Sequence, residues 1–200
     1  MHASPSMQKF EMIKKTVIVG DSGVGKNTFL GRIYNVIFKD EYIESIGALI
    51  GKYDTRLEHG RDQVALKLLG WDITGQERFD GVRKSYLEGT DGAIIMGRTD
   101  RKESIGELAC WTDKVYAVVG KVPVVYVINK VGKERRGEMK VRKLARQENT
   151  KYWFFDFMMG RKDELVQPVE YLGRRIVDRH FEALEKSFRE ATRFPQRTKS

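Results

Sequence analysis

A glycine-rich segment containing one lysine, residues 20–28, has the residue types that hold a phosphate group. It reads Gly-Asp-Ser-Gly-Val-Gly-Lys-Asn-Thr, and it follows an apolar, strand-like run at 16–19 and precedes a helical pattern of apolar side chains. Glycines let the backbone curl so that several N–H groups point inward, and such a nest at a helix N-terminus suits an anion. We expect the Lys26 ammonium to reach the outer phosphates of a bound ligand.

The residues expected to contact the phosphates are Asp21, Ser22, Gly23, Val24, Gly25, Lys26, Asn27 and Thr28. The alternative, a strand–helix turn that binds nothing, is disfavoured because the motif lies in the strand–loop–helix context that it requires. One position departs from the pattern G-x-x-x-x-G-K-[ST]. Asn27 stands where a Ser or Thr hydroxyl normally ligates Mg²⁺, so the sequence predicts an intact phosphate cradle with an altered metal ligand.

Apolar periodicity predicts strands and helices that alternate along the chain. We expect strands at 14–20, 48–58, 63–71, 92–96, 122–128 and 152–157, and helices at 25–35, 103–119, 138–147 and 163–188. This order predicts an α/β fold, a single P-loop NTPase domain with a mostly parallel six-stranded sheet and helices on both faces. The expected organisation is a flexible lead at 1–10, the domain at 11–190 and a basic, flexible tail at 191–200.

Three polar loops follow predicted strands, at 20–26, 72–78 and 129–132. In open α/β sheets the ligand lies outside the carboxyl ends of the strands. We therefore expect these loops to converge on one site.

Composition bounds the class of protein. The 200-residue chain has a net charge of +9, and it contains no apolar run near the roughly 20 residues that span a bilayer. The N-terminal residues lack the apolar core of a signal peptide. Cys110 is the only cysteine, which excludes an internal disulfide and fits a reducing compartment. Because no cysteine lies near the C-terminus, no prenyl or other lipid anchor is expected.

The densest basic run lies at 133–146. It could meet an acidic protein, RNA or a membrane surface, although a solvated helix face is the favoured interpretation. No aromatic residues are interleaved for base stacking, so direct nucleic-acid binding is not expected. The tryptophans and the cysteine are assigned structural roles, and we expect Trp71, Trp111, Trp153 and Cys110 in the core. The histidines, His2, His59 and His180, are scattered along the chain and indicate no catalytic or metal site.

Residues 71–79 carry a resemblance to a known family. They read Trp-Asp-Ile-Thr-Gly-Gln-Glu-Arg-Phe, which resembles the switch II segment of Ras-superfamily small GTPases, and the Asn-Lys pair at 129–130 resembles the guanine-recognition motif of that family. The resemblance covers about residues 11–180. Within the superfamily the chain is most similar to Ran (residues 93–96 and 151–176) and to Rab (residues 20–26 and 75–79).

The resemblance implies a site for GTP or GDP with Mg²⁺ and a role for each matching residue. Gly75 would donate its N–H to the γ-phosphate and Gln76 would orient the attacking water, as catalytic residues. Phe38 would pack beside the guanine. The positions that match nucleotide-binding residues of the family outside the phosphate loop are Phe38, Ser45, Asp72, Gly75, Asn129 and Lys130, and those that match metal ligands are Asn27, Ser45 and Asp72.

Departures from the family pattern cluster at the guanine end and in the switch II segment. Gly132 stands where an Asp would pair with the guanine N1 and N2 donors, and the loss of that bidentate, charge-assisted contact predicts an affinity lower by about two orders of magnitude or more. Residues 158–160, Met-Met-Gly, replace the Ser-Ala-Lys that supports the base. Thr74 replaces an alanine before Gly75, and Asn27 is expected to weaken Mg²⁺–GTP more than GDP.

Two functions of different classes follow. The first is a nucleotide-dependent molecular switch in intracellular transport, Ran-like between nucleus and cytoplasm or Rab-like on vesicles, with slow GTP hydrolysis. Its partners would be exchange factors, GTPase-activating proteins and effectors that contact residues 38–47 and 73–86, with nuclear transport receptors added for a Ran-like protein. The alternative is a degenerate, non-cycling GTPase that binds or sequesters partners of such a switch. A weaker third option is a phosphate-loop protein with relaxed base choice.

Overall fold

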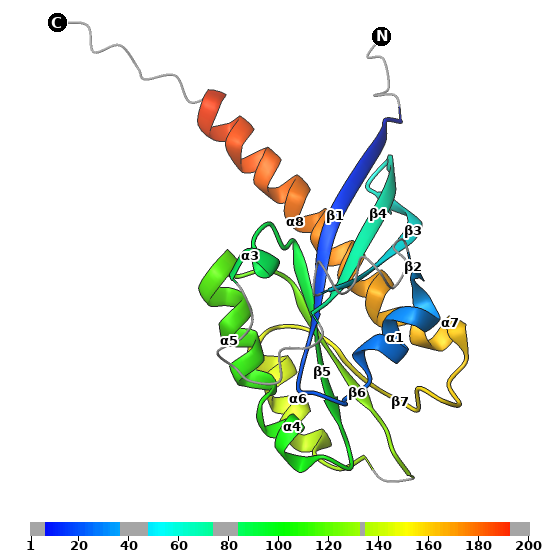
Figure 1. Ribbon diagram of the computed structural model, residues 1–200. Helices are drawn as coiled ribbons and strands as arrows, with labels where there is room; N and C mark the ends of the chain where they lie inside the picture. The colour runs from blue at the N-terminus through cyan, green and yellow to red at the C-terminus, as the bar shows by residue number, and fades with distance from the viewer. Residues whose placement is uncertain (1–6, 37–47, 74–83, 133–134, 193–200) are drawn as a thin grey trace, which may run out of the picture.

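The computed structural model describes residues 7–36, 48–73, 84–132 and 135–192, and all structural statements concern these residues. Within them, seven strands form one sheet in the order β2-β3-β4-β1-β5-β6-β7 (Figure 1). β2 and β4 each pair antiparallel with β3, and every other pairing is parallel. The strands are β1 (Lys9–Val19), β2 (Asn35–Val36), β3 (Leu49–His59), β4 (Asp62–Asp72), β5 (Gly92–Arg98), β6 (Val124–Asn129) and β7 (Tyr152–Phe155).

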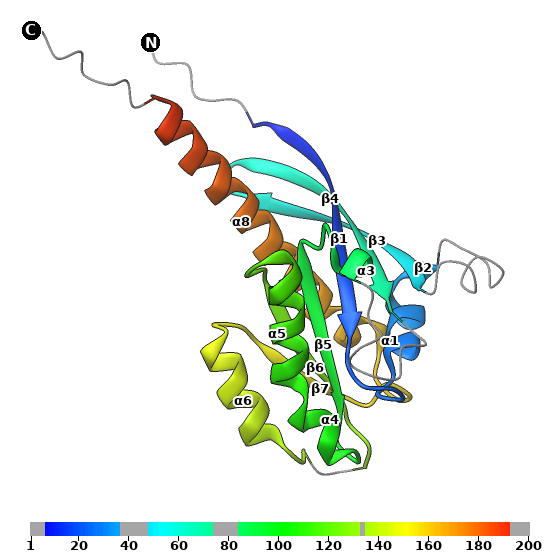
Figure 2. The same cartoon turned by 60° about the vertical axis from the view of Figure 1, so that its left-hand side comes forward.

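Helices cover both faces of this sheet (Figures 1 and 2). They are α1 (Lys26–Ile33), α3 (Lys84–Leu87), α4 (Lys102–Gly106), α5 (Leu108–Val119), α6 (Glu138–Gln147), α7 (Lys162–Leu165) and α8 (Gln167–Thr192). None of the helices within the described ranges is long and apolar enough to cross a membrane.

Side chains that alternate along the central strands enter two separate cores. On β1, Ile18 packs in the core covered by α1, α7 and α8, whereas Val17 and Val19 pack in the core covered by α3, α4, α5 and α6. Because both faces of these strands are buried, β5 and β6 read as nearly continuous apolar runs, as parallel strands between two helical layers do. The α/β prediction is confirmed, with a mostly parallel sheet.

The predicted number of strands is wrong. The sequence predicts six strands, and β2 is the seventh; it is a two-residue pairing of Asn35 and Val36 with Lys52 and Gly51. Both β2 residues are exposed, so no apolar alternation marks the strand. Residues 35 and 36 were expected in a helix and a loop, respectively.

Several element boundaries also differ from the predictions. β1 begins at Lys9 rather than 14, since its first half pairs only with β4 and its exposed side chains include charged residues. The helix predicted at 103–119 is two helices, α4 and α5. α8 continues to Thr192, and its last turns expose Leu184 and Phe188. The short helix α3 was not predicted.

A buried tyrosine fits against two glycines of the β3–β4 pair. Gly51 and Gly70 are cross-strand partners, and Tyr34, 3% exposed, lies over both of them. A Cβ on Gly70 would lie 2.7 Å from Cε1 of Tyr34. We therefore expect Gly70→Ala to lower the free energy of unfolding by about 1–3 kcal/mol through overpacking, measured by urea unfolding.

The matched control is Gly31→Ala. A Cβ at Gly31 meets no atom within 4 Å, and alanine favours the helical backbone of α1 by up to about 1 kcal/mol relative to glycine. This variant should be as stable as the wild type or more stable. Equal urea midpoints for Gly70→Ala and the wild type would contradict the packing of Tyr34.

Candidate functional site

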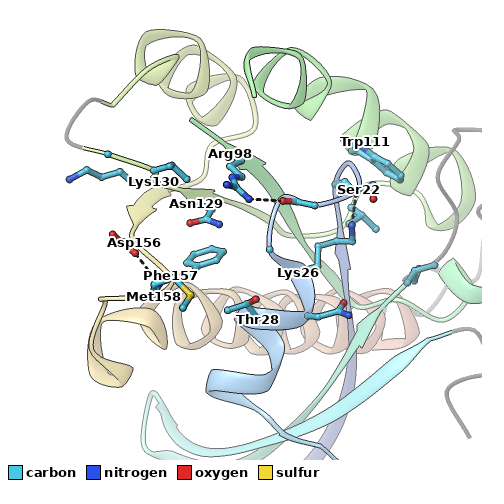
Figure 3. Close-up of a pocket in the computed structure, with 18 residues that line it drawn as sticks. Ser22, Lys26, Thr28, Arg98, Trp111, Asn129, Lys130, Asp156, Phe157 and Met158 are labelled. Atoms are coloured by element: carbon cyan, nitrogen blue, oxygen red, sulfur yellow. Dashed lines mark hydrogen bonds between the residues drawn. The ribbon is translucent and has the colours of Figure 1, made fainter. Parts of the chain in front are cut away.

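A cavity of about 740 Å³ opens at the carboxyl ends of the central parallel strands (Figure 3). This is the position at which open α/β sheets bind ligands. Its lining comes from the phosphate loop, the start of α1, the ends of β4, β5 and β6, α5 and the segment after β7. The lining residues are Val19, Gly20, Ser22, Gly23, Gly25, Lys26, Asn27, Thr28, Ile73, Arg98, Trp111, Asn129, Lys130, Val131, Gly132, Asp156, Phe157 and Met158.

The phosphate loop adopts a conformation that its glycines permit. Gly20, Gly23 and Gly25 have φ values of 147°, 73° and 106°, which L side chains rarely adopt. A Cβ on Gly20 would also lie 2.3 Å from the Met96 carbonyl oxygen. Among the described residues no side chain caps the N-terminus of α1, so its first-turn N–H groups are available to an anion at the mouth of the loop.

Lys26 bends back over the loop that precedes it. Its Nζ donates hydrogen bonds to the carbonyl oxygens of Gly20, at 2.9 Å, and Asp21, at 3.0 Å. Burial lowers the pKa of Lys26, and the charges of Asp72 and Asp21 partly oppose that shift. The ammonium is thus held at the loop, and Figure 3 shows the side chain beside the cavity.

Asp72, the last residue of β4, is a buried carboxylate without a hydrogen-bond partner among the residues that the structure describes. It is 0% exposed, and neither of its oxygens accepts a hydrogen bond from any residue in the described ranges. Burial raises the pKa of Asp72 to about 7, while the charge of Lys26 lowers it. An unpaired carboxylate next to a phosphate cradle fits a hydrated divalent cation, because oxygen ligands are what Mg²⁺ prefers.

The rest of the described chain offers no self-sufficient metal site. Nowhere in residues 7–36, 48–73, 84–132 and 135–192 do three His, Cys, Asp or Glu side chains gather to hold a metal. A cation beside Asp72 would therefore need phosphate oxygens and water to complete its coordination, which is how Mg²⁺ is usually bound.

The buried Asp72 makes a pH-dependent prediction for the nucleotide-free, metal-free protein. The folded-state pKa of Asp72 lies above its unfolded value, so the free energy of unfolding falls as pH rises from about 4 to 7. Above pH 7 the full cost of burying the ionised carboxylate is present. We expect Asp72→Asn to stabilise the protein by roughly 4 kcal/mol at pH 8 and by only about 1–2 kcal/mol at pH 5. Urea unfolding in a chelator at both pH values measures this difference.

Asp54→Asn is the control, because Asp54 is an exposed carboxylate paired with Lys52. Surface pairs of this kind contribute about 0–1 kcal/mol. A gain from Asp72→Asn that is equal at pH 5 and pH 8 would show that Asp72 is not held in a desolvated site.

The side of the cavity opposite Asp72 is built by β6 and the segment after β7. Asn129, the last residue of β6, donates from Nδ2 to the Val24 carbonyl oxygen at 3.1 Å, which joins β6 to the phosphate loop. Phe157 is buried against Phe29 of α1, with ring centroids 5.5 Å apart. Arg32 donates to the carbonyl oxygens of Phe157 and Gly160, so α1 anchors the segment after β7.

Gly132 and Met158 lie at this end of the cavity, where the sequence predicts a degenerate base site. Gly132 is exposed with φ 78°, and a Cβ there would meet no atom within 4 Å. Met158 is 80% exposed. The carboxylate of Asp156 is engaged within its own loop, since Oδ1 accepts the N–H groups of Met158 and Met159 at 2.9 and 3.2 Å.

The structure brings most of the predicted phosphate and base residues to one cavity. The predicted site residues that line it are Ser22, Gly23, Gly25, Lys26, Asn27, Thr28, Asn129 and Lys130. Three further predicted residues lie behind this lining. Asp21 accepts a hydrogen bond from Trp111, Val24 accepts one from Asn129, and Asp72 interacts with the charge of Lys26. Phe38, Ser45, Thr74, Gly75 and Gln76 fall outside the described residues.

Sequence reasoning missed three residues that line the cavity: Arg98 at the end of β5, Trp111 on α5 and Phe157 after β7. It also missed Arg101, which lies just before α4 and contacts the phosphate loop. Trp111 was assigned to the core alone; it is 6% exposed, but its Nε1 also donates to Asp21 Oδ1 at 2.8 Å. The signal for Arg98 and Arg101 was present, because they follow a predicted parallel strand whose carboxyl end faces the same edge as the three predicted loops.

Comparison with known proteins gives a family match over the part of the chain that builds this cavity. Residues 15–132 match the Roc family, described as Ras of Complex, Roc, domain of DAPkinase. The match covers more than half of the chain, and it includes the phosphate loop, β4 with Asp72, β5 and the Asn-Lys pair at the end of β6.

Proposed function

Since this chain belongs to the Roc family of Ras-like GTPase domains, we propose that it is a guanine-nucleotide-binding molecular switch that hydrolyses GTP slowly. The observation that supports the proposal is the proximity of two features beside one cavity, the phosphate loop with Lys26 and the carboxylate of Asp72. The phosphate loop offers uncapped N–H groups at the start of α1 and holds Lys26 beside them, and Asp72 supplies a buried carboxylate that accepts no hydrogen bond from the described residues. A phosphate–cation complex satisfies both at once.

The chain's own residues would act mainly by binding and orientation, as in phosphoryl transfer generally. The loop amides and Lys26 hold the phosphates, and Asp72, together with Asn27 and Ser45, is the proposed holder of Mg²⁺. The metal would supply neutralisation of phosphate charge. Gly75 and Gln76 are the proposed catalytic residues, which donate to the γ-phosphate and orient water; Phe38 is proposed to pack beside the guanine.

For the cellular role, we propose intracellular transport of the Ran or Rab type, in the cytoplasm or nucleus. The support is the sequence resemblance to Ran at residues 93–96 and 151–176 and to Rab at residues 20–26 and 75–79. The proposed partners are exchange factors, GTPase-activating proteins and effectors at residues 38–47 and 73–86, with nuclear transport receptors for a Ran-like role.

One observation favours a second candidate, a non-cycling binding module. At the base end of the cavity, Gly132 presents no side chain, and the carboxylate of Asp156 is engaged with its own loop. A protein with weakened nucleotide binding could still present a GTPase-like surface to partners of a true switch.

The first experiment is the nucleotide content of the purified protein, read by denaturing it and separating the supernatant by ion exchange. Stoichiometric GDP or GTP is expected for the switch, followed by slow release of labelled phosphate from GTP. A folded protein that is empty and that does not bind added GDP or GTP would overturn the switch and support the binding module.

A further inference from the structure

Two arginines, Arg98 at the end of β5 and Arg101 just before α4, contact carbonyl oxygens of the phosphate loop. Arg98 donates from Nη1 to the Gly23 carbonyl oxygen at 3.1 Å, and Arg101 donates from Nη1 to the Ser22 carbonyl oxygen at 2.7 Å. Figure 3 shows Arg98 reaching from β5 toward this loop. The Arg101 guanidinium also lies against Gly23, where a Cβ would be 2.7 Å from Nη1 and 3.0 Å from Cζ.

These contacts bear on the anion-binding face of the loop. A phosphate nest works because consecutive N–H groups point at the anion, and a carbonyl oxygen turned into the same space would repel it. The two carbonyl oxygens belong to consecutive residues: Arg101 binds that of Ser22, and Arg98 binds that of Gly23. Charge-assisted hydrogen bonds of this kind are roughly twice as strong as neutral ones, so they favour one orientation of these peptides.

The turn that carries the two arginines is itself held firmly. Asp100 accepts a two-pronged contact from Arg98, with Nε to Oδ1 at 2.7 Å and Nη2 to Oδ2 at 2.9 Å. Ser104, 2% exposed, accepts the Arg98 N–H at 3.0 Å and donates from Oγ to the Arg101 carbonyl oxygen at 2.7 Å. The arginines thus extend from a fixed support rather than from a free surface loop.

We propose that Arg98 and Arg101 are positioning residues that hold the phosphate loop in its anion-binding shape before a nucleotide enters. The inference rests on the nucleotide binding proposed above and adds a determinant of its affinity. The arginines act through the Ser22 and Gly23 peptides, and a preformed loop binds more tightly because less ordering is needed on binding. Their loss leaves Lys26 and the glycines in place but lets the loop sample other orientations.

The test compares Arg98→Ala, Arg101→Ala and the double variant with Arg174→Ala. Arg174 is a matched control, because its Nη1 also donates to a main-chain carbonyl oxygen, that of Glu58 at 3.2 Å, and neither residue lines the cavity. The first readout is amide hydrogen exchange of residues 20–26 in the nucleotide-free protein. We expect faster exchange in the double variant and wild-type exchange in Arg174→Ala.

The second readout is the dissociation rate of a fluorescent GDP. We expect the double variant to release GDP about tenfold faster or more, as the loss of charged hydrogen bonds predicts, with wild-type release from Arg174→Ala. The double Arg→Lys variant should release GDP at a rate between those of the wild type and the double Ala variant. An ammonium can still donate to one carbonyl oxygen, but a lysine at 98 cannot form the two-pronged contact with Asp100.

The outcomes separate this inference from the proposed function. Wild-type exchange at residues 20–26 in the double variant overturns the positioning role, whether or not a nucleotide binds. Faster exchange with unchanged GDP release shows that the loop shape does not limit binding and also overturns it. A wild-type protein that binds no GDP overturns the proposed switch, and the exchange measurement still decides the role of the arginines.

Discussion

Lys26→Ala is expected to lower the affinity for GDP and GTP by about two orders of magnitude or more. The Lys26 ammonium lies at the anion-binding nest, held by the Gly20 and Asp21 carbonyl oxygens. Each charge-assisted hydrogen bond to a phosphate contributes about 1.5–3 kcal/mol, and two such bonds account for the expected loss. Equilibrium titration with a fluorescent GDP measures it.

The fold should survive this change. Burial lowers the pKa of Lys26, so the folded protein gains little from keeping the charge when no phosphate is bound. Lys15→Ala is the matched control, since Lys15 is also a partly buried lysine that donates to a main-chain carbonyl oxygen, that of Glu88 at 2.8 Å. Lys15→Ala should bind GDP as the wild type does. Unaltered GDP binding by Lys26→Ala would exclude the phosphate loop as the nucleotide site.

The parts of this fold that follow from burial and local chemistry could be predicted from the sequence. β5 and β6 could be predicted because both their faces are covered and their residues are almost all apolar. The phosphate loop could be predicted because its glycines and Lys26 have fixed spacing between a strand and a helix. β2 could not be predicted, because it exists only through two pairings with β3 and buries neither of its side chains.

Site residues could be predicted where the type of side chain itself indicates the role. They were harder to predict where a side chain contributes by contacting the backbone of another loop. Asn129 belongs to a known motif, and its bond to Val24 follows from the fold. For Arg98 and Arg101 the sequence indicates only that they follow a predicted parallel strand, and the tertiary structure is needed to place them on the Gly23 and Ser22 carbonyls. Trp111 is both a core residue and the donor to Asp21, a double role that apolar spacing does not reveal.

Gly132→Asp is expected to raise the affinity for GTP by about two orders of magnitude, as the restored bidentate contact to the guanine N1 and N2 donors predicts. A Cβ at this position meets no atom of the described residues within 4 Å, so these residues leave room for the side chain. The φ of 78° opposes the change, but Asp tolerates the left-handed region better than most residues and the strain is about 1–2 kcal/mol. The gain exceeds this cost.

Two comparisons isolate the cause of that gain. Inosine triphosphate lacks the 2-amino donor, so Gly132→Asp should raise its affinity less than that of GTP if the carboxylate contacts the base edge. Gly132→Asn has similar size and backbone preference but no charge, and it should give no comparable gain. Adding Asn27→Ser should make GTP binding depend more strongly on Mg²⁺, because a hydroxyl replaces the amide beside Lys26. An unchanged GTP affinity in Gly132→Asp would mean that the cavity does not hold guanine in the orientation that the family resemblance implies, and that the absence of the carboxylate is not what limits binding.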